Sequence, residues 1–225
     1  MSDVLQGSQE RWPNRQVTMA ILTTLEMFSQ DRYSAFLTKT KPGQLNKEWF
    51  DWFVGEWSVA RTVSKIARES VRSFLDNQFR ADVATNRDGR AVDRAAKTIS
   101  DKGWGAVKRA DGKSSLPVSL VSKIAFFLKP DVFIPYDSTA LRGINCLRGT
   151  KKNGGQGRLA GPSYREYLQA FERVYVSSER QISIMLREPW VKAVSTRLGL
   201  DPKVISRPTF RRKVVDNLLM QLGGS

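Results

Sequence analysis

The sequence of 225 residues contains no histidine and only one cysteine, Cys146. The missing histidine removes the side chain that most often serves as a general base or as a metal ligand. A single cysteine excludes a disulfide framework and a cysteine-based zinc site. An enzyme of this composition must therefore use aspartate, glutamate, lysine, tyrosine or arginine, and we expect neither a metal nor another cofactor.

Long apolar runs are also missing from the chain. No stretch approaches the roughly 20 apolar residues of a membrane-spanning helix, and residues 1–13 lack the apolar core of a signal peptide. The sequence therefore predicts a cytoplasmic protein without a membrane partner. A chain of this length buries a core without metal or disulfide support.

Charge of one sign dominates. The chain has 37 basic and 22 acidic side chains, a net charge of +15 and a pI near 10.2. The surplus is concentrated in residues 138–225, which carry 16 basic and 6 acidic side chains. A net charge of about 2–8 suits a small soluble domain, so this surplus favours a nucleic acid as the partner. Duplex DNA is the partner that we expect, bound by a monomer.

The basic residues of the C-terminal half supply the predicted DNA contacts. These residues lie in a glycine-rich loop at 148–161 and at the start of the last predicted helix. Cations at a helix N-terminus oppose the helix dipole, which indicates an external anion; the alternatives are that Asp216 and solvent neutralise them, and that the loop is merely disordered. The predicted contacts are Lys151, Lys152, Arg158, Arg211, Arg212 and Lys213.

Apolar residues recur at helical spacing along most of the chain, and no convincing set of strands is present. We predict helices at 15–29, 46–79 (one helix, or two broken near Gly55) and 90–99. The helix that holds Lys123 has Ser115 as its cap and Pro117 in its first turn, and it ends at 129–131. Further helices are predicted after residue 137, at 163–186 and within 206–225. The aromatic stripe of the second helix is more typical of a core than of base stacking. The expected fold is an all-α, two-lobed helical bundle forming one module, with an N-terminal part at 1–114 and a catalytic part at 115–225.

The most informative segment is 116–143, LPVSLVSKIAFFLKPDVFIPYDSTALRG. Lys123 lies in an apolar run, which predicts a desolvated amine with a lowered pKa. Asp137 precedes Ser-Thr-Ala-Leu and is placed to cap a helix as a fixed carboxylate. Two plainer interpretations stay open: Asp137 is only a cap, and Lys123 shares a solvent-facing stripe with Ser119 and Ser122.

Two aromatic residues could contact a base. Trp104 lies between Gly103 and Gly105, a setting that suits base intercalation or equally an anchor that holds a loop on the core. Tyr136 directly precedes Asp137. We predict Trp104 and Tyr136 as pocket or wedge residues.

The order lysine, apolar residues, proline and helix-opening aspartate resembles the catalytic segment of the helix-hairpin-helix DNA glycosylase superfamily, especially its 8-oxoguanine glycosylase-like branch. A looser likeness to short bacterial members covers the second half of the chain. The residues that carry the resemblance are Leu116, Pro117, Lys123, Ala125, Pro130, Pro135 and Asp137, with Ser122, Phe133, Tyr136, Ser138, Tyr164 and Tyr167 for the looser likeness.

The resemblance implies that Lys123 attacks the sugar C1′ and that Asp137 stabilises the developing positive charge. It also implies a DNA contact at Ser122 and no iron–sulfur cluster here, since the cysteines are missing. The chain departs from the family pattern at 118–122, where Val-Ser-Leu-Val-Ser replaces the hairpin glycines, and in its shorter lysine-to-aspartate spacing of 14 residues.

These residues are sufficient for base excision without histidine or metal. A carboxylate stabilises the oxocarbenium-like state of N-glycosidic cleavage, and the base must first be flipped out of the stack. We expect a glycosylase that leaves an abasic site, with lyase activity if Lys123 forms a Schiff base. The substrate is an oxidised purine in DNA repair or a hypermodified phage cytosine in anti-phage defence. A noncatalytic DNA- or RNA-binding module is the alternative, and a nuclease is disfavoured because no carboxylate cluster for magnesium is apparent.

Overall fold

The computed structural model describes residues 12–29, 45–57, 59, 62–105, 116–149, 159 and 163–224. Within these ranges the secondary structure is helical, apart from one isolated antiparallel bridge between Val63 and Gly105. The predicted all-α class is therefore confirmed.

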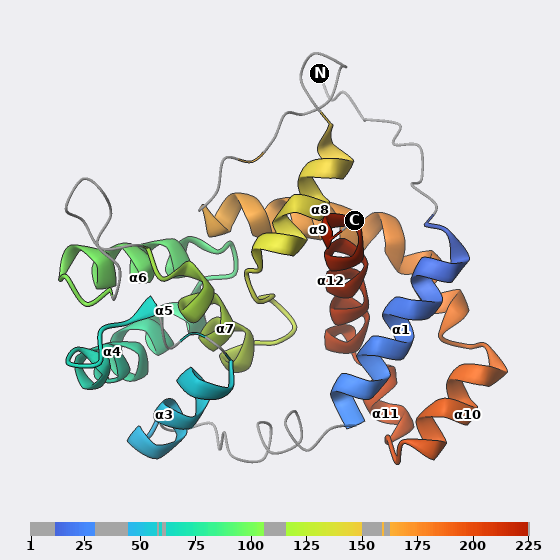
Figure 1. The fold of residues 1–225 in the computed structure, drawn as a ribbon, viewed down its shortest axis with the longest axis horizontal. Coiled ribbons are helices and arrows are strands. Elements are labelled where there is room, and N and C mark those ends of the chain that lie inside the picture. Colours follow the sequence, from blue (N-terminus) through green and yellow to red (C-terminus); the bar gives the residue numbers. More distant parts are fainter. Residues whose placement is uncertain are drawn as a thin grey trace.

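The helices form two groups, which lie side by side in Figure 1. The first, called the α3–α7 lobe, contains α3 (Lys47–Glu56), α4 (Arg68–Phe74), the π-helical turn η2 (Leu75–Phe79), α5 (Arg80–Thr85), α6 (Arg90–Asp101) and α7 (Val118–Leu128). The second, called the α8–α12 lobe, contains α1 (Asn14–Ser29), α8 (Ser138–Arg148), α9 (Tyr164–Met185), α10 (Pro189–Arg197), α11 (Pro202–Ile205) and α12 (Pro208–Gly224). Helix α1 packs on α12, and α7 packs on α6.

The predicted helix at 46–79 is divided near Gly55, which was one of the two alternatives. Helix α3 ends at Glu56, one residue beyond Gly55, and α4 begins at Arg68. Before α4, the chain pairs with the turn that follows α6, where Val63 bridges Gly105 and the Ser64 amide donates to the Trp104 carbonyl at 3.0 Å. The aromatic stripe belongs to the core as predicted, since Trp49, Phe50 and Phe53 are buried.

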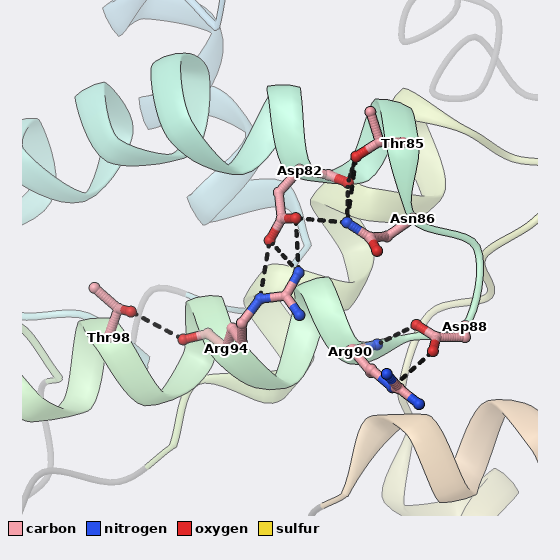
Figure 2. Close-up of polar contacts among 7 residues, drawn as sticks. All are labelled: Asp82, Thr85, Asn86, Asp88, Arg90, Arg94 and Thr98. Carbon is pink, nitrogen blue, oxygen red and sulfur yellow. Dashed lines mark hydrogen bonds and ion pairs between the residues drawn. The ribbon is translucent and has the colours of Figure 1, made fainter.

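Polar contacts on the surface of the α3–α7 lobe join α5 to α6, as Figure 2 shows. The guanidinium group of Arg94 spans both carboxylate oxygens of Asp82 at 2.7 Å, and Asp82 also accepts from the side-chain amide of Asn86. Asp88 binds the backbone amide and the guanidinium of Arg90 at the start of α6. Because Arg94 and Arg90 are exposed, each ion pair contributes at most about 1 kcal/mol. Of the two pairs, the one between Arg94 and Asp82 connects α6 with α5.

A close contact between α8 and α12 organises the second lobe. A Cβ atom on Gly143 would lie 2.1 Å from the Leu219 carbonyl oxygen, and one on Gly223 would lie 1.9 Å from that of Thr139. Only glycine fits at these two positions, so the helix backbones touch. The apolar face predicted for the last helix is fully buried beside this contact: Val214, Val215, Leu218 and Leu219.

The lobes are joined where α6 meets the start of α9. Both carboxylate oxygens of Asp93 accept from the first amides of α9, Tyr164 at 2.7 Å and Arg165 at 3.0 Å. Helix-terminal amides have no partner within their own helix, and here an aspartate from the other lobe provides one. This contact holds α9 against the segment that carries the predicted catalytic residues.

Candidate functional site

Lys123 lies on α7, in the α3–α7 lobe, whereas α8 belongs to the α8–α12 lobe. Its Nζ donates to the backbone carbonyl of Trp57 at 2.9 Å and lies 5.9 Å from the centre of the Trp57 ring. The flanking Ser122 and Ile124 are buried, so Lys123 is half-buried rather than part of a solvent-facing stripe. The plainer interpretation of Lys123 as a surface lysine is therefore excluded.

Burial is the main influence on the pKa of Lys123 and lowers it from the ordinary lysine value. The carboxylate of Asp137 opposes this effect, the ammonium group of Lys213 adds to it, and Asp216 opposes it more weakly. The predicted lowering of the pKa is confirmed. The same interactions show that Asp137, Lys213 and Asp216 all lie within electrostatic range of the Lys123 amine.

Asp137 caps α8. Its Oδ1 accepts from the amides of Thr139 at 2.7 Å and Ala140 at 3.4 Å. The backbone of Asp137 is extended, as expected of a residue that precedes a helix. The predicted cap is confirmed. Capping leaves Oδ2 of Asp137 free of any hydrogen bond to the described residues, and the carboxylate is fixed in direction.

The segment between α7 and α8 is held in place on both sides. The Oγ of Ser122 accepts from the Tyr136 amide at 2.9 Å, so the neighbour of Lys123 is bonded directly to the neighbour of Asp137. On the other side, the hydroxyl of Tyr164 bridges the amide and the carbonyl of Ile134 at 3.1 and 2.7 Å. These bonds explain how two residues 14 positions apart come to share one site.

Tyr167, which belongs to the looser resemblance, packs against this segment and contacts Tyr136 within it. The Tyr167 hydroxyl donates to the Pro135 carbonyl, and the ring of Tyr136 meets that of Tyr167 edge-on at 5.0 Å. Burial raises the pKa of Tyr167 well above its usual range, and burial together with the charge of Asp137 raises the pKa of Tyr136. Both hydroxyls are therefore neutral donors over the physiological pH range.

Asp216 and Lys213 form a second polar pair on α12. Their ion pair is buried, with 12% of the Lys213 side chain and 2% of the Asp216 side chain exposed. The remaining carboxylate oxygen, Oδ1 of Asp216, is buried without a hydrogen-bond partner in the described part of the chain. The sequence suggested Asp216 only as a neutralising group and did not connect it with Lys123, because that proximity requires α12 to be folded against α8.

The other predicted site residues are dispersed. Trp104 packs edge-on against Phe74 and lies beneath the Lys102 ammonium group, which makes it an anchor of the turn after α6. Tyr136 is next to Asp137 and half-buried, whereas Ser122 is fully buried and bonded internally. The predicted loop contacts Lys151, Lys152 and Arg158 lie outside the described residues.

The three cationic side chains at the start of α12 have different interactions. Arg212 is 4% exposed, and its guanidinium binds Glu172 at 2.6 Å and the Val132 carbonyl at 2.9 Å. It therefore acts within the fold and presents no surface to a DNA phosphate, which corrects its prediction as a DNA contact. Lys213 is neutralised by Asp216, so the alternative interpretation applies to it. Arg211 lines a separate cavity.

Searches of the described residues give two further findings. They contain no group of three or more cysteine, aspartate or glutamate side chains that could hold a metal ion. No helix among them has the length and apolar character needed to cross a bilayer.

Comparison of the chain with protein-family models, curated proteins and solved structures gives no match.

Proposed function

We propose that this protein is a DNA glycosylase that flips a modified base out of duplex DNA and cleaves its N-glycosidic bond. The observation that supports this most directly is the environment of Lys123. The amine is half-buried, its hydrogen bond goes to a backbone carbonyl rather than to a carboxylate, and burial lowers its pKa. Such an amine loses its proton more readily than a free lysine and becomes a nucleophile.

In the proposed reaction, the neutral Lys123 amine attacks the sugar C1′ with its lone pair. The bond between C1′ and the base breaks, and the base leaves with the bonding electrons and takes a proton from solvent. The nitrogen that is now bonded to C1′ loses a proton. The sugar ring then opens at the C1′–O4′ bond, O4′ takes up a proton, and a Schiff base results. Water hydrolyses it to an abasic site, or elimination of the 3′ phosphate nicks the strand.

Asp137 stabilises the developing charge electrostatically in this reaction. Positive charge develops on the sugar as the base departs, and a carboxylate fixed beside it lowers the barrier. The cap on α8 holds Asp137 in one direction before the substrate arrives, so no reorganisation is needed during the reaction. If water replaces Lys123 as the nucleophile, Asp137 keeps the same role.

The substrate class follows from the charge and from the resemblance. A net charge of +15 suits a polyanion, and the sugar of the target nucleotide is reached only after the base is flipped. We propose an oxidised purine or a hypermodified phage cytosine as the base, in repair or in defence.

The test is incubation of the full-length protein with duplex oligonucleotides containing 8-oxoguanine and, separately, with phage DNA containing hypermodified cytosine. Abasic sites are measured by alkaline cleavage, and covalent adducts are trapped with borohydride. We expect Asp137→Asn to reduce excision by about 100-fold or more. Asparagine caps a helix about as well as aspartate, so the loss would reflect the charge. Lys123→Gln should abolish the trapped adduct.

Lys129→Gln is the matched control, since Lys129 directly follows α7 and its Nζ, like that of Lys123, donates to backbone carbonyls, those of Ala84 and Val83. It should leave both excision and trapping intact. If the wild-type protein binds every duplex but leaves each one intact, the protein is a noncatalytic binding module. If excision proceeds without a trapped adduct, water is the nucleophile.

A further inference from the structure

A cavity of about 540 Å³ lies in the α8–α12 lobe, where the end of α9, the helices α10 and α11 and the start of α12 meet. Figure 1 shows these elements together at the end of the molecule far from the α3–α7 lobe. Neither Lys123 nor Asp137 is among the lining residues. Cavities of roughly 300–1,000 Å³ are typical of small-molecule sites, so this one has the size of a separate ligand site.

The cavity has an apolar wall and a basic rim. Its apolar side is formed by Leu186, Val191 and Ile205, of which Val191 is buried. Three cations also line it, Arg187, Lys192 and Arg211, against one carboxylate, that of Glu188. Apolar walls with a few converging charges fix both the body and the orientation of a ligand. The charge surplus selects an anion.

Arg211 is the cation best placed to meet that anion. Its bonds to the Ser183 hydroxyl and to the Ser206 carbonyl are both long, at 3.4 Å, and Glu179 lies at 3.6 Å. Its Nε is buried and has no hydrogen-bond partner among the residues that the structure describes. A guanidinium group carries five donors in a planar fork. The contacts of Arg211 within the chain therefore leave donor capacity unused.

The Nε of Arg212 is likewise buried without a partner among the described residues, but the two neighbouring cations have closer acidic partners than Arg211. Arg212 is bonded to Glu172 at 2.6 Å, and Lys213 is paired with Asp216. The first turn of α12 carries no acidic residue, so its positive dipole end is not offset locally. Of the three consecutive cations, only Arg211 lines the cavity, and it is the one with the weakest internal partners.

We infer that this cavity binds a small organic anion, with its apolar body on Leu186, Val191 and Ile205 and its anionic group at Arg211. The ligand class is an aromatic or aliphatic sulfonate, phosphate or carboxylate small enough to enter the concave site. A DNA backbone is a poor fit, because a phosphodiester strand has no apolar group to place against the inner wall. The inference is independent of the chemistry at Lys123.

The probe is 8-anilino-1-naphthalenesulfonate, an aromatic body with one sulfonate, titrated into the full-length protein by fluorescence. Its uncharged analogue N-phenyl-1-naphthylamine shares the body and lacks the anion. Arg211→Gln should weaken binding of the sulfonate about tenfold or more, because a charge-assisted hydrogen bond is lost, and should leave the uncharged analogue unaffected. Ile205→Trp fills the cavity and should abolish binding of both probes.

Arg207→Gln is the matched control, since Arg207 is an exposed arginine four residues before Arg211 that does not line the cavity. It should bind both probes like the wild type. Thermal melts of all variants establish that each is folded, because unfolded chain also enhances the fluorescence. The inference is overturned if folded Arg211→Gln and Ile205→Trp proteins bind the sulfonate as the wild type does. Displacement of the probe by a 20-base-pair duplex would also overturn it and assign the cavity to the DNA surface.

Discussion

Two lysines lie within electrostatic range of each other on facing parts of the molecule, and their surroundings differ. Lys213 on α12 is neutralised by Asp216 in a buried ion pair. Lys123 on α7 donates instead to the carbonyl of Trp57, and burial lowers its pKa. The same side chain is therefore held as a cation in one place and made easier to deprotonate in the other.

The aspartates differ in the same way. Asp216 is nearly fully buried and supplies the countercharge of Lys213, whereas one oxygen of Asp137 caps α8. Asp137 therefore remains a fixed charge beside Lys123 without forming a close ion pair with it among the described contacts. The hydrogen-bond partners, rather than the residue types, therefore distinguish the structural lysine–aspartate pair from the pair that we propose to be reactive.

The largest effect that we predict is on the structural pair. Asp216→Asn leaves the ammonium group of Lys213 buried without its countercharge, which should lower the free energy of unfolding by about 3–5 kcal/mol. Urea denaturation measures this loss. The double variant Lys213→Met, Asp216→Asn removes the buried charge and should recover most of it. If the single and double variants are equally destabilised, the pair is not coupled and the contrast with Lys123 fails.

The second prediction concerns the pH dependence at Lys123. Burial disfavours the charged form of the amine, so its pKa lies below the ordinary lysine value. The neutral form, which we propose to be the nucleophile, becomes populated as the pH rises, and at a lower pH than for an ordinary lysine. As the pH is raised, borohydride trapping on a duplex with a preformed abasic site should accelerate about tenfold per pH unit. The rate should reach its plateau at a pH below that at which free lysine titrates.

Asp137→Asn sharpens this test, because the carboxylate of Asp137 raises the pKa of Lys123. Its removal should shift the plateau of the trapping rate to lower pH. A profile that keeps rising through the ordinary lysine pKa, in both proteins, would contradict the desolvated environment of the amine.

The longer elements of the fold could be predicted from the sequence, and the shorter ones could not. Helices α1 and α9, of 16 and 22 residues, have regular apolar spacing, and both were predicted within two residues of their ends. Helices α10 and α11, of 9 and 4 residues, begin at prolines and were missed. A short helix presents too few periodic positions to be distinguished from a loop.

Only those features of the candidate site that depend on residues close together in the sequence could be predicted. Asp137 was identified as a cap because the cap depends on the next three residues, and the pKa direction of Lys123 followed from its apolar neighbours. The bond from Lys123 to Trp57 joins residues 66 positions apart. No periodicity encodes such a contact, and Asp216 was not connected with Lys123 for the same reason.

A smaller effect is expected from removing the cap on α8. Asp137→Ala deprives the amides of Thr139 and Ala140 of their acceptor and should cost about 1 kcal/mol of stability. Asp137→Asn keeps an acceptor and should cost only a few tenths. Thermal and urea unfolding of the two variants measure the difference. Equal losses would mean that the charge of Asp137, rather than its cap, supports the fold.

A small effect on stability is also expected from Lys123→Met, in contrast to Asp216→Asn. Methionine fills the apolar volume and removes an amine that is costly to desolvate, while one carbonyl, that of Trp57, loses its donor. These terms oppose each other, so the free energy of unfolding should change by less than about 1 kcal/mol. Such a small change is expected if Lys123 serves the proposed reaction rather than folding. A loss above about 2 kcal/mol in urea unfolding would instead show that Lys123, like Lys213, is present for the fold.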